Sequence, residues 1–432
     1  MSQLFLRYQG SRQGFELPST WHLLSFAAFQ DRPQPTDAVG IARQALKKPV
    51  NHPPLAHAVS AKDKIAIIIE DPTRSSPKQQ VLRAVLEELA AAQVPSSQIA
   101  IVIALGTHRQ LSEEEMAQVY GKDLVESYEF VNHDCNAPDL VPIATLASGT
   151  AVKINPRVYE ATFTIGVGSI FPHPMNGFGG GGKILFPAVA DFDSILEHHL
   201  QHSFRGESRL GHLRGNAFYE EVNALAQAGG LNFILNSVLD HKDRLYQVVC
   251  GAPVEAHQAG VAISRDILTM PFPQKSDVTI ISAFPYSEGP QIMKPLAPAS
   301  EITREGGVVI LSADCKVPLP ESYLKGCEDF RKTYSGRLRE AVLELFQNNR
   351  RIMQDGAPEF NMSMAQALLA QNDYTVILVS REISSDTAKR LGFAHAESID
   401  QAVEMAHDIV PEAKVHVVPS GGVILPVLPF AG

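Results

Sequence analysis

The stretch Lys64-IAIIIEDPTRSSPKQQVLRAVLEELAAAQVPSSQIAIVI-Ala104 decides the fold class of this chain. It begins at 64–69 with a short apolar, β-branched run, which is typical of a strand buried in a parallel sheet. Residues 81–92 then carry apolar side chains at helical spacing, and a second β-branched run follows at 99–104. Strand, loop, helix and strand in this order predict the βαβ unit of an open α/β sheet.

Polar loops follow these predicted strands at their carboxyl ends, where open α/β folds bind ligands. Asp71-Pro-Thr73-Arg74 follows the first strand, and Gly106-Thr-His108 follows the second. A guanidinium grips a carboxylate or phosphate well, and an imidazole can act as an acid or base near neutral pH. A capping Asp71 beside a solvated Arg74, and a purely structural His108, remain open alternatives at this point.

A third predicted strand, at 161–167, leads into the glycine-rich loop Phe171-PHPMNGFGGGG-Lys183. From Gly177 this loop reads G-x-x-x-x-G-K, the start of a phosphate-binding Walker A motif. The next residue is Ile184, which cannot hold magnesium as the usual Ser or Thr does. We therefore expect the loop to present Lys183, and a phosphate contact, without ATPase chemistry. His173 lies between two prolines, which predicts a fixed imidazole or merely a shaped turn.

Three histidines lie close together on a predicted helix that starts near Asp191. His198 and His202 have the i, i+4 spacing of zinc metalloproteases, but His199 stands where their catalytic glutamate would be. A metal-dependent hydrolase using His198 and His202 is therefore an alternative, and a disfavoured one. Most of these histidines are also compatible with an ordinary helix surface.

A second alternation of strands and helices begins near residue 278 and continues to a last strand at 415–418. With 432 residues, the chain exceeds one typical domain. We predict two α/β domains with mainly parallel sheets and an interdomain cleft. Residues 1–265 would form the N-terminal domain with the cofactor site, and 413–432 would return to it. Residues 270–412 would form the C-terminal domain, in which Gln291 and Lys294 share a helix face.

Composition narrows the class of protein. The net charge is −10, from 37 basic and 47 acidic residues, which argues against a nucleic-acid partner. The four cysteines are scattered without a C-x-x-C pair, so neither a disulfide framework nor a cysteine zinc site is expected. The sequence shows no signal-peptide core and no apolar run of about 18 residues. We therefore expect a cytoplasmic protein without a membrane partner.

Taken together and in order, these motifs resemble the nickel-dependent lactate racemases and related 2-hydroxyacid racemases and epimerases. The resemblance spans almost the whole chain. It rests on one set of residues in register: Asp71, Arg74, His108, His173, Lys183, His199, Gln291 and Lys294.

The resemblance implies a cofactor and a role for each of these residues. The cofactor would be a nickel-pincer nucleotide, a pyridinium-3-thioamide-5-thiocarboxylic acid mononucleotide that carries nickel. Lys183 would be its tether and His199 the protein's nickel ligand. His108 and His173 would be the acid–base pair. The remaining contacts are divided between cofactor and substrate: Asp71, Thr73, Gly179, Gly180, Gly181 and Gly182 for the cofactor, and Arg74, Gln291 and Lys294 for the substrate carboxylate.

The resemblance also implies a racemase or epimerase that acts on C2 of a 2-hydroxy acid, with cofactor-maturation proteins as partners. Lactate racemases carry a tyrosine directly before the glutamine, whereas this chain has Pro290 there. The substrate is therefore expected to be bulkier or more polar than lactate, with Tyr286 as a possible replacement. The remaining alternative is a non-catalytic protein that binds a nucleotide or sugar acid. A monomer and a homodimer are both compatible with the sequence.

Overall fold

The fold was analysed in a computed structural model, which describes residues 3–33, 37–354 and 356–429. The chain forms two compact units. Residues 32–267 make the N-terminal unit, whereas residues up to 31 and from 268 onward make the C-terminal unit. The chain therefore passes from one unit to the other twice.

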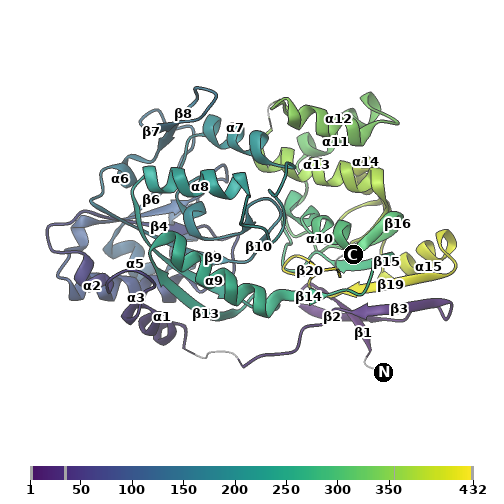
Figure 1. The fold of residues 1–432 in the computed structure, drawn as a ribbon, viewed down its shortest axis with the longest axis horizontal. Helices are drawn as coiled ribbons and strands as arrows, with labels where there is room; N and C mark the ends of the chain where they lie inside the picture. The colour runs from purple at the N-terminus through teal and green to yellow at the C-terminus, as the bar shows by residue number, and fades with distance from the viewer. Residues whose placement is uncertain (1–2, 34–36, 355, 430–432) are drawn as a thin grey trace. The chain divides into compact units, whose positions relative to one another are not determined.

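The N-terminal unit is built on a six-stranded sheet with the order β13-β12-β9-β4-β5-β6. All neighbouring strands are parallel except β12 and β13, which pair antiparallel. The strands are β4 (Ile65–Glu70), β5 (Ile99–Ala104), β6 (Glu129–Asn132), β9 (Phe163–Ile170), β12 (Leu231–Leu239) and β13 (Leu245–Gly251). The predicted βαβ unit is thus confirmed at the centre of this sheet (Figure 1).

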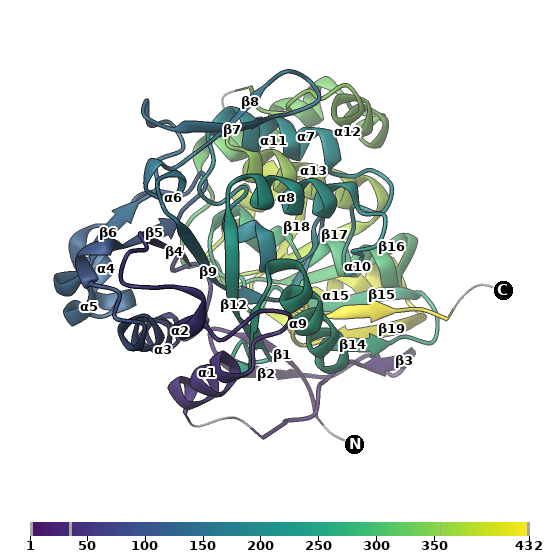
Figure 2. The ribbon, with the colours of Figure 1, turned by 60° about the vertical axis from the view of Figure 1, so that its left-hand side comes forward.

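Every residue of β4 and β5 is buried, because helices cover both faces of this sheet. On one face, Ile65, Ile67 and Ile69 form a core with α1 (Ala38–Lys47) and α3 (Lys78–Ala91). The opposite face meets the short 3₁₀ helix η2 (Gly181–Ile184) and, behind it, α8 (Ala217–Ala228). Both layers can be followed in Figures 1 and 2.

The remaining elements of this unit are shorter or lie around the sheet. They are α2 (Leu55–Ala58), η1 (Ser96–Gln98), α4 (Glu113–Tyr120), α5 (Lys122–Ser127), β7 (Val141–Thr145), β8 (Ala151–Ile154), α6 (Pro156–Tyr159), β10 (Pro172–His173), β11 (Gly177–Phe178), α7 (Phe192–His202) and α9 (Pro253–Leu268). Helix α7 starts as predicted, since the Asp191 side chain accepts a hydrogen bond from the Ser194 N–H.

The C-terminal unit contains a second six-stranded sheet, in which all neighbours are parallel, with the order β18-β17-β16-β15-β19-β3. Its strands are β3 (Trp21–Phe26), β15 (Ser276–Ser282), β16 (Thr303–Ser312), β17 (Thr375–Val379), β18 (Ala394–Ala396) and β19 (Ala413–Val418). Around it lie β1 (Leu4–Tyr8), β2 (Ser11–Phe15), β14 (Thr269–Pro271), η3 (Gly289–Met293), α10 (Leu296–Ile302), α11 (Glu321–Thr333), α12 (Leu338–Gln347), α13 (Pro358–Asp373), α14 (Ser385–Leu391), α15 (Ile399–Ile409) and β20 (Leu425–Val427).

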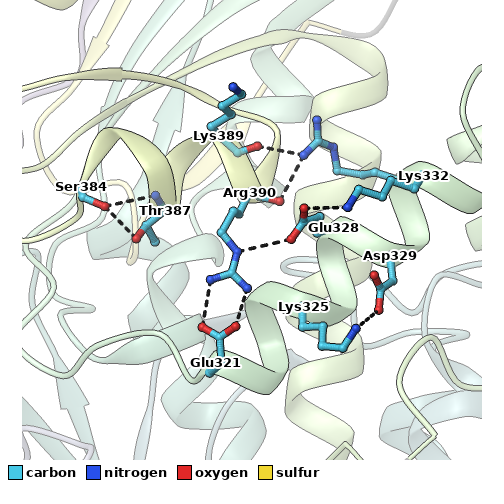
Figure 3. Close-up of polar contacts among 10 residues, drawn as sticks. Glu321, Lys325, Glu328, Asp329, Lys332, Ser384, Thr387, Lys389 and Arg390 are labelled. Atoms are coloured by element: carbon cyan, nitrogen blue, oxygen red, sulfur yellow. Dashed lines mark hydrogen bonds and ion pairs between the residues drawn. The ribbon is translucent and has the colours of Figure 1, made fainter.

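An ion-pair network joins α11 to α14 on the surface of the C-terminal unit (Figure 3). Arg390 binds both carboxylate oxygens of Glu321, at 2.9 and 2.6 Å, and also approaches Glu328 at 3.4 Å. Arg331 donates to the backbone carbonyls of Lys389 and Arg390 near the end of α14, where helix carbonyls lack partners. The network fixes the two helices to each other.

The predicted course of the chain ends requires correction. Residues 413–418 do not return to the N-terminal unit, because β19 pairs with β15 inside the C-terminal sheet. Instead, the N-terminal strand β3 pairs with β19, and Trp21 is buried in the same core. The prediction assigned residues 1–265 to the N-terminal domain, and no local pattern showed that β3 pairs with a strand near the other end of the chain.

Two further findings bear on the class of protein. The four cysteines are buried, and none of them forms a disulfide within the described part of the chain. No helix in residues 3–33, 37–354 and 356–429 is long and apolar enough to cross a membrane.

Candidate active site

The loop after β4 holds a carboxylate in a network of donors. Asp71 is buried, and its Oδ1 accepts hydrogen bonds from the backbone N–H of Thr73 at 3.0 Å and the Thr73 hydroxyl at 2.6 Å. Its Oδ2 accepts from Nδ1 of His108 at 2.5 Å. Burial disfavours the charge of Asp71, but the His108 hydrogen bond and the positive charges of His108 and Arg74 hold its pKa well below the usual value. Asp71 is therefore an ionised partner of His108.

This contact fixes the state of the His108 ring. Because the carboxylate can only accept, Nδ1 of His108 carries a proton. The neutral ring then has its lone pair on Nε2, and a proton added there is stabilised by the charge of Asp71. The backbone supports the arrangement, since the N–H of His108 donates to Leu105 and Gly106 has a φ of +55°. The predicted meeting of the two polar loops is thus present.

Arg74 extends the same network towards the glycine-rich loop. Its guanidinium donates to the Thr73 hydroxyl at 3.2 Å and lies 5.1 Å from the centre of the Phe171 ring. Lys78, at the start of α3, donates to the carbonyl oxygen of Arg74, and this fixes the loop from behind. Asp243, in the turn between β12 and β13, lies near Arg74, and burial raises the pKa of its carboxyl group. Sequence reasoning missed this residue.

His173 lies at the base of a tight hairpin. β10 and β11 pair antiparallel, with His173 opposite Gly177. The backbone N–H groups of Met175 and Asn176 approach Nδ1 of His173 at 3.3 and 3.1 Å. Nδ1 therefore accepts, and the neutral ring carries its proton on Nε2, which is the opposite tautomer to that of His108. The prediction of a held imidazole agrees with this geometry.

The glycines of this loop serve close packing inside the protein. A Cβ on Gly181, where φ is +59°, would lie 2.7 Å from the ring of buried His257. The N–H of Gly181 donates to Asn236 Oδ1 at 2.9 Å, and the carbonyl of Gly179 accepts from His257 Nε2 at 2.9 Å. Several of the backbone groups expected to position a phosphate are thus engaged internally. An apolar residue at position 184, in place of the Ser or Thr of a Walker A motif, is explained by packing, because the Ile184 side chain contacts β9 at Gly166.

Lys183 and His199 meet around Phe218, a buried residue at the start of α8. Nζ of Lys183 is 5.5 Å and the His199 ring is 5.0 Å from the centre of the Phe218 ring. Burial, and then the charge of Arg74, lower the pKa of Lys183 to about 7. Burial and the nearby Lys183 lower the pKa of His199 to about 3. Near neutral pH the site therefore offers an uncharged imidazole and a partly uncharged amine.

The hydrogen bonds of His199 leave one ring nitrogen available for a ligand. Its Nδ1–H donates to the carbonyl oxygen of Ile195 at 2.8 Å, one turn earlier in α7. The lone pair then lies on Nε2, and a second hydrogen bond of this kind is the usual way in which proteins orient a metal-binding imidazole.

The neighbouring histidines differ from His199 in their surroundings. His198 is fully buried, with its ring packed edge-on against Phe186 and Phe218. In addition, His199 stands where zinc metalloproteases have the glutamate that activates water. The burial of His198 and the absence of this glutamate do not support the alternative of a hydrolase that uses His198 and His202.

In the C-terminal unit, Gln291 and Lys294 lie side by side as predicted. Nζ of Lys294 donates to Oε1 of Gln291 at 3.2 Å and lies 4.5 Å from the centre of the Tyr286 ring. Pro290 is buried, and its carbonyl accepts from Ser363. Tyr286 therefore borders the lysine to which the resemblance gives a role in binding the substrate.

Within the N-terminal unit, the structure brings most of the predicted site residues into one connected set. Asp71, His108 and Arg74 form one part, and Arg74 reaches the glycine-rich loop through Phe171. Lys183, His199 and, at 6.5 Å between ring centres, His173 surround Phe218. Sequence reasoning missed Phe218, His257 and Asn236, because their contacts in the site are with residues distant in the sequence.

Comparison with known proteins gives a consistent family. The family model for the lactate racemase N-terminal domain matches residues 8–211, and the model for the C-terminal domain matches residues 274–425. Lactate racemase from Thermoanaerobacterium thermosaccharolyticum is 28% identical over 389 residues, or 88% of each chain. Lactate racemase from Lactiplantibacillus plantarum is 27% identical over 391 residues, or 88% of this chain and 89% of the other.

Solved structures agree with the sequence comparisons. The lactate racemase apoprotein from T. thermosaccharolyticum superposes with a TM-score of 0.86 at 25% identity and covers 99% of this chain and 100% of that one. A Thermotoga maritima protein shares the fold, with a TM-score of 0.66 at 16% identity over 92% of this chain and 100% of that one. Because the two domain models match in order and span most of the sequence, this chain belongs to the lactate racemase family of isomerases.

Proposed function

We propose that this protein inverts the C2 centre of a 2-hydroxy carboxylate by moving the C2 hydrogen as hydride and the hydroxyl hydrogen as a proton. Membership of the family supports racemisation. The contact between Asp71 and His108, beside Arg74, is the observation that supports proton transfer from the hydroxyl group. Loss of the C2 hydrogen as a proton would place a second negative charge beside the carboxylate. Loss as hydride avoids that charge and gives a planar 2-keto acid.

The proposed cofactor is a nickel-pincer nucleotide, and the residues present fit it. His199 has a lone pair on Nε2 for a metal, and Lys183 has an amine of lowered pKa for a covalent link. Both surround Phe218, a flat apolar face. When bound, this group supplies an acceptor that takes up and returns hydride. In this proposal, Asp71 and Thr73, in the loop after β4, help to position the cofactor.

The two histidines then handle the proton. Nε2 of His108 accepts the hydroxyl proton of one enantiomer, and Asp71 stabilises the resulting imidazolium. On the opposite side, the Nε2–H of neutral His173 donates a hydrogen bond to the oxygen. To return a proton to this oxygen, His173 must first take up a second proton from solvent at Nδ1 and act as an imidazolium, while the His108 imidazolium releases its proton to solvent. A positioned acid or base contributes about 10²–10⁴-fold to a rate, so neither histidine is dispensable.

For the substrate carboxylate we propose Arg74, together with Gln291 and Lys294. Lys294 is held by Gln291 and the Tyr286 ring, so it is oriented and not a freely moving cation. Pro290 lacks the hydroxyl that the resemblance places there, and we propose a substrate that is bulkier or more polar than lactate.

A chiral substrate panel tests this function directly. The full chain is produced together with the cofactor-synthesis and maturation proteins and incubated with single enantiomers of lactate and of larger 2-hydroxy acids. Chiral chromatography should show inversion, and His108→Ala and His173→Ala should each abolish it, whereas His57→Gln on exposed α2 should not. Nickel-containing protein that binds these acids without inverting any would contradict the proposal and favour a binding protein. Hydrolysis with zinc alone would favour the hydrolase.

A further inference from the structure

A cluster on α7 and α8 is not used by the proposed reaction. His198 and His202 lie one turn apart on α7, and Glu221 projects from α8. One ligand atom from each of the three residues lies within 4.8 Å of the other two. The Oε2 of Glu221 is 2.7 Å from Nε2 of His202 and 3.8 Å from Nε2 of His198. Both imidazoles thus face one carboxylate oxygen.

The state of His198 points to a missing ligand. Its side chain is 0% exposed, and neither ring nitrogen forms a hydrogen bond, although Glu221 and a backbone group of Phe218 lie near. Buried polar groups are normally paired, so an imidazole left in this state needs an explanation. The hydrogen bond between His202 and Glu221 accounts for these two side chains but not for the buried ring of His198.

We propose that His198, His202 and Glu221 bind one divalent transition-metal ion, at a site distinct from the nickel ligand His199. Two imidazoles and a carboxylate suit Zn²⁺, Co²⁺ or Ni²⁺, whereas Mg²⁺ and Ca²⁺ prefer oxygen ligands only. With bonds of about 2.0–2.2 Å, a tetrahedral ion holds neighbouring ligand atoms roughly 3.3–3.5 Å apart. The observed 2.7 and 3.8 Å lie on either side of that spacing, so small side-chain shifts complete the site.

The ion would clamp α7 to α8 and so fix the helix that carries His199. Binding displaces the proton shared by His202 and Glu221, because a ligating imidazole nitrogen carries no proton. The buried His198 closes the inner side, and Glu221, whose side chain is 25% exposed, leaves the outer side for a fourth ligand or water. We assign this ion a structural role, because it joins two helices and because His199, not a glutamate, follows His198.

Co²⁺ binding to the full chain, without substrate or nickel-pincer cofactor, tests the proposal independently of racemase activity. We expect one equivalent of Co²⁺ to give the intense visible bands of a tetrahedral site, and Zn²⁺ to displace it. His202→Gln and Glu221→Gln should each weaken binding by about tenfold or more, since each removes a ligand. The partly exposed positions of these two side chains favour folded variants, which thermal melts verify.

Two controls separate this site from its surroundings. His199→Ala removes the proposed nickel ligand, and His57→Gln removes an exposed histidine elsewhere; both should keep Co²⁺ affinity within about threefold of the parent. In the parent, Zn²⁺ should raise the melting temperature, and this rise should vanish in His202→Gln. Absence of saturable binding in the parent, or affinity lost with His199→Ala and kept with His202→Gln, would overturn the proposal.

Discussion

Replacing Asp71 with Asn tests the central feature of the proposed chemistry with almost no change in shape. The Thr73 backbone N–H cannot rotate away, and it donates to Oδ1 of Asp71. The amide oxygen of the variant must therefore face Thr73, which turns its NH₂ group towards His108. An NH₂ group donates to Nδ1 of His108, so the neutral ring then carries its proton on Nε2. The proposed base loses its lone pair.

The expected loss follows from that change of tautomer. Removing a general base and its charged partner costs about 10²–10⁴-fold in rate, or roughly 3–5 kcal/mol in the barrier. The assay is the racemisation rate of cofactor-loaded protein from each enantiomer, combined with ¹⁵N spectra of labelled histidine to assign the His108 tautomer. Thr73→Val is the matched control, because it removes a hydroxyl donor and keeps the carboxylate. We expect no more than about tenfold loss from Thr73→Val, in line with one neutral hydrogen bond.

A racemisation rate in Asp71→Asn above about a tenth of the parent rate would contradict the role given to Asp71. A proton on Nδ1 of His108 in the spectra of the variant would contradict the predicted change of tautomer. Loss of activity with an unchanged tautomer would assign Asp71 to cofactor positioning instead. The paired readout therefore distinguishes the two roles given to this residue.

Further predictions concern pH, packing and surface charge. Because its folded pKa is depressed, Asp71 contributes stability above its unfolded pKa of about 3.9, and acid unfolding should remove a contribution that Asp71→Asn lacks. With a pKa of about 7, Lys183 should react with amine reagents increasingly between pH 6 and 8, well before ordinary lysines, as mass spectrometry of labelled peptides would show. Gly181→Ala should lower the urea midpoint more than Gly206→Ala: both glycines have positive φ, but only the first is crowded. Arg390→Gln should lower the free energy of unfolding only slightly, because its partner Glu321 is exposed and ion pairs at the surface contribute little.

The parts of the site that could be predicted from the sequence are those fixed by local pattern. The β-branched runs at 64–69 and 99–104 predict parallel strands, and the edge where such strands end is a property of the topology. The convergence of Asp71, Arg74 and His108 follows from that edge alone. Residue type suggests acid–base chemistry for His108 and anion binding for Arg74, and the specific roles proposed for them rest on the family resemblance.

What could not be predicted depends on contacts between distant segments. Phe218 is an ordinary apolar residue near a helix start, and nothing in its neighbours marks it as the side chain shared by Lys183 and His199. The glycine-rich loop indicated a phosphate cradle, whereas His257 from α9 occupies the space that the glycines leave. The pairing of β3 with β19 involves residues almost 400 positions apart, which no local pattern encodes.

The opposite tautomers of His108 and His173 have a consequence for kinetics. His108 is ready to accept a proton at Nε2, whereas His173 must first release the N–H groups of Met175 and Asn176 from Nδ1. One enantiomer should therefore turn over with a lower kcat. For true enantiomers the equilibrium constant is one, so kcat/KM must be equal in both directions, and the slower direction must have the lower KM. Unequal kcat with equal kcat/KM would support this asymmetry in a racemase. Identical kcat and KM for both enantiomers would show that the hairpin at 173–178 does not limit turnover.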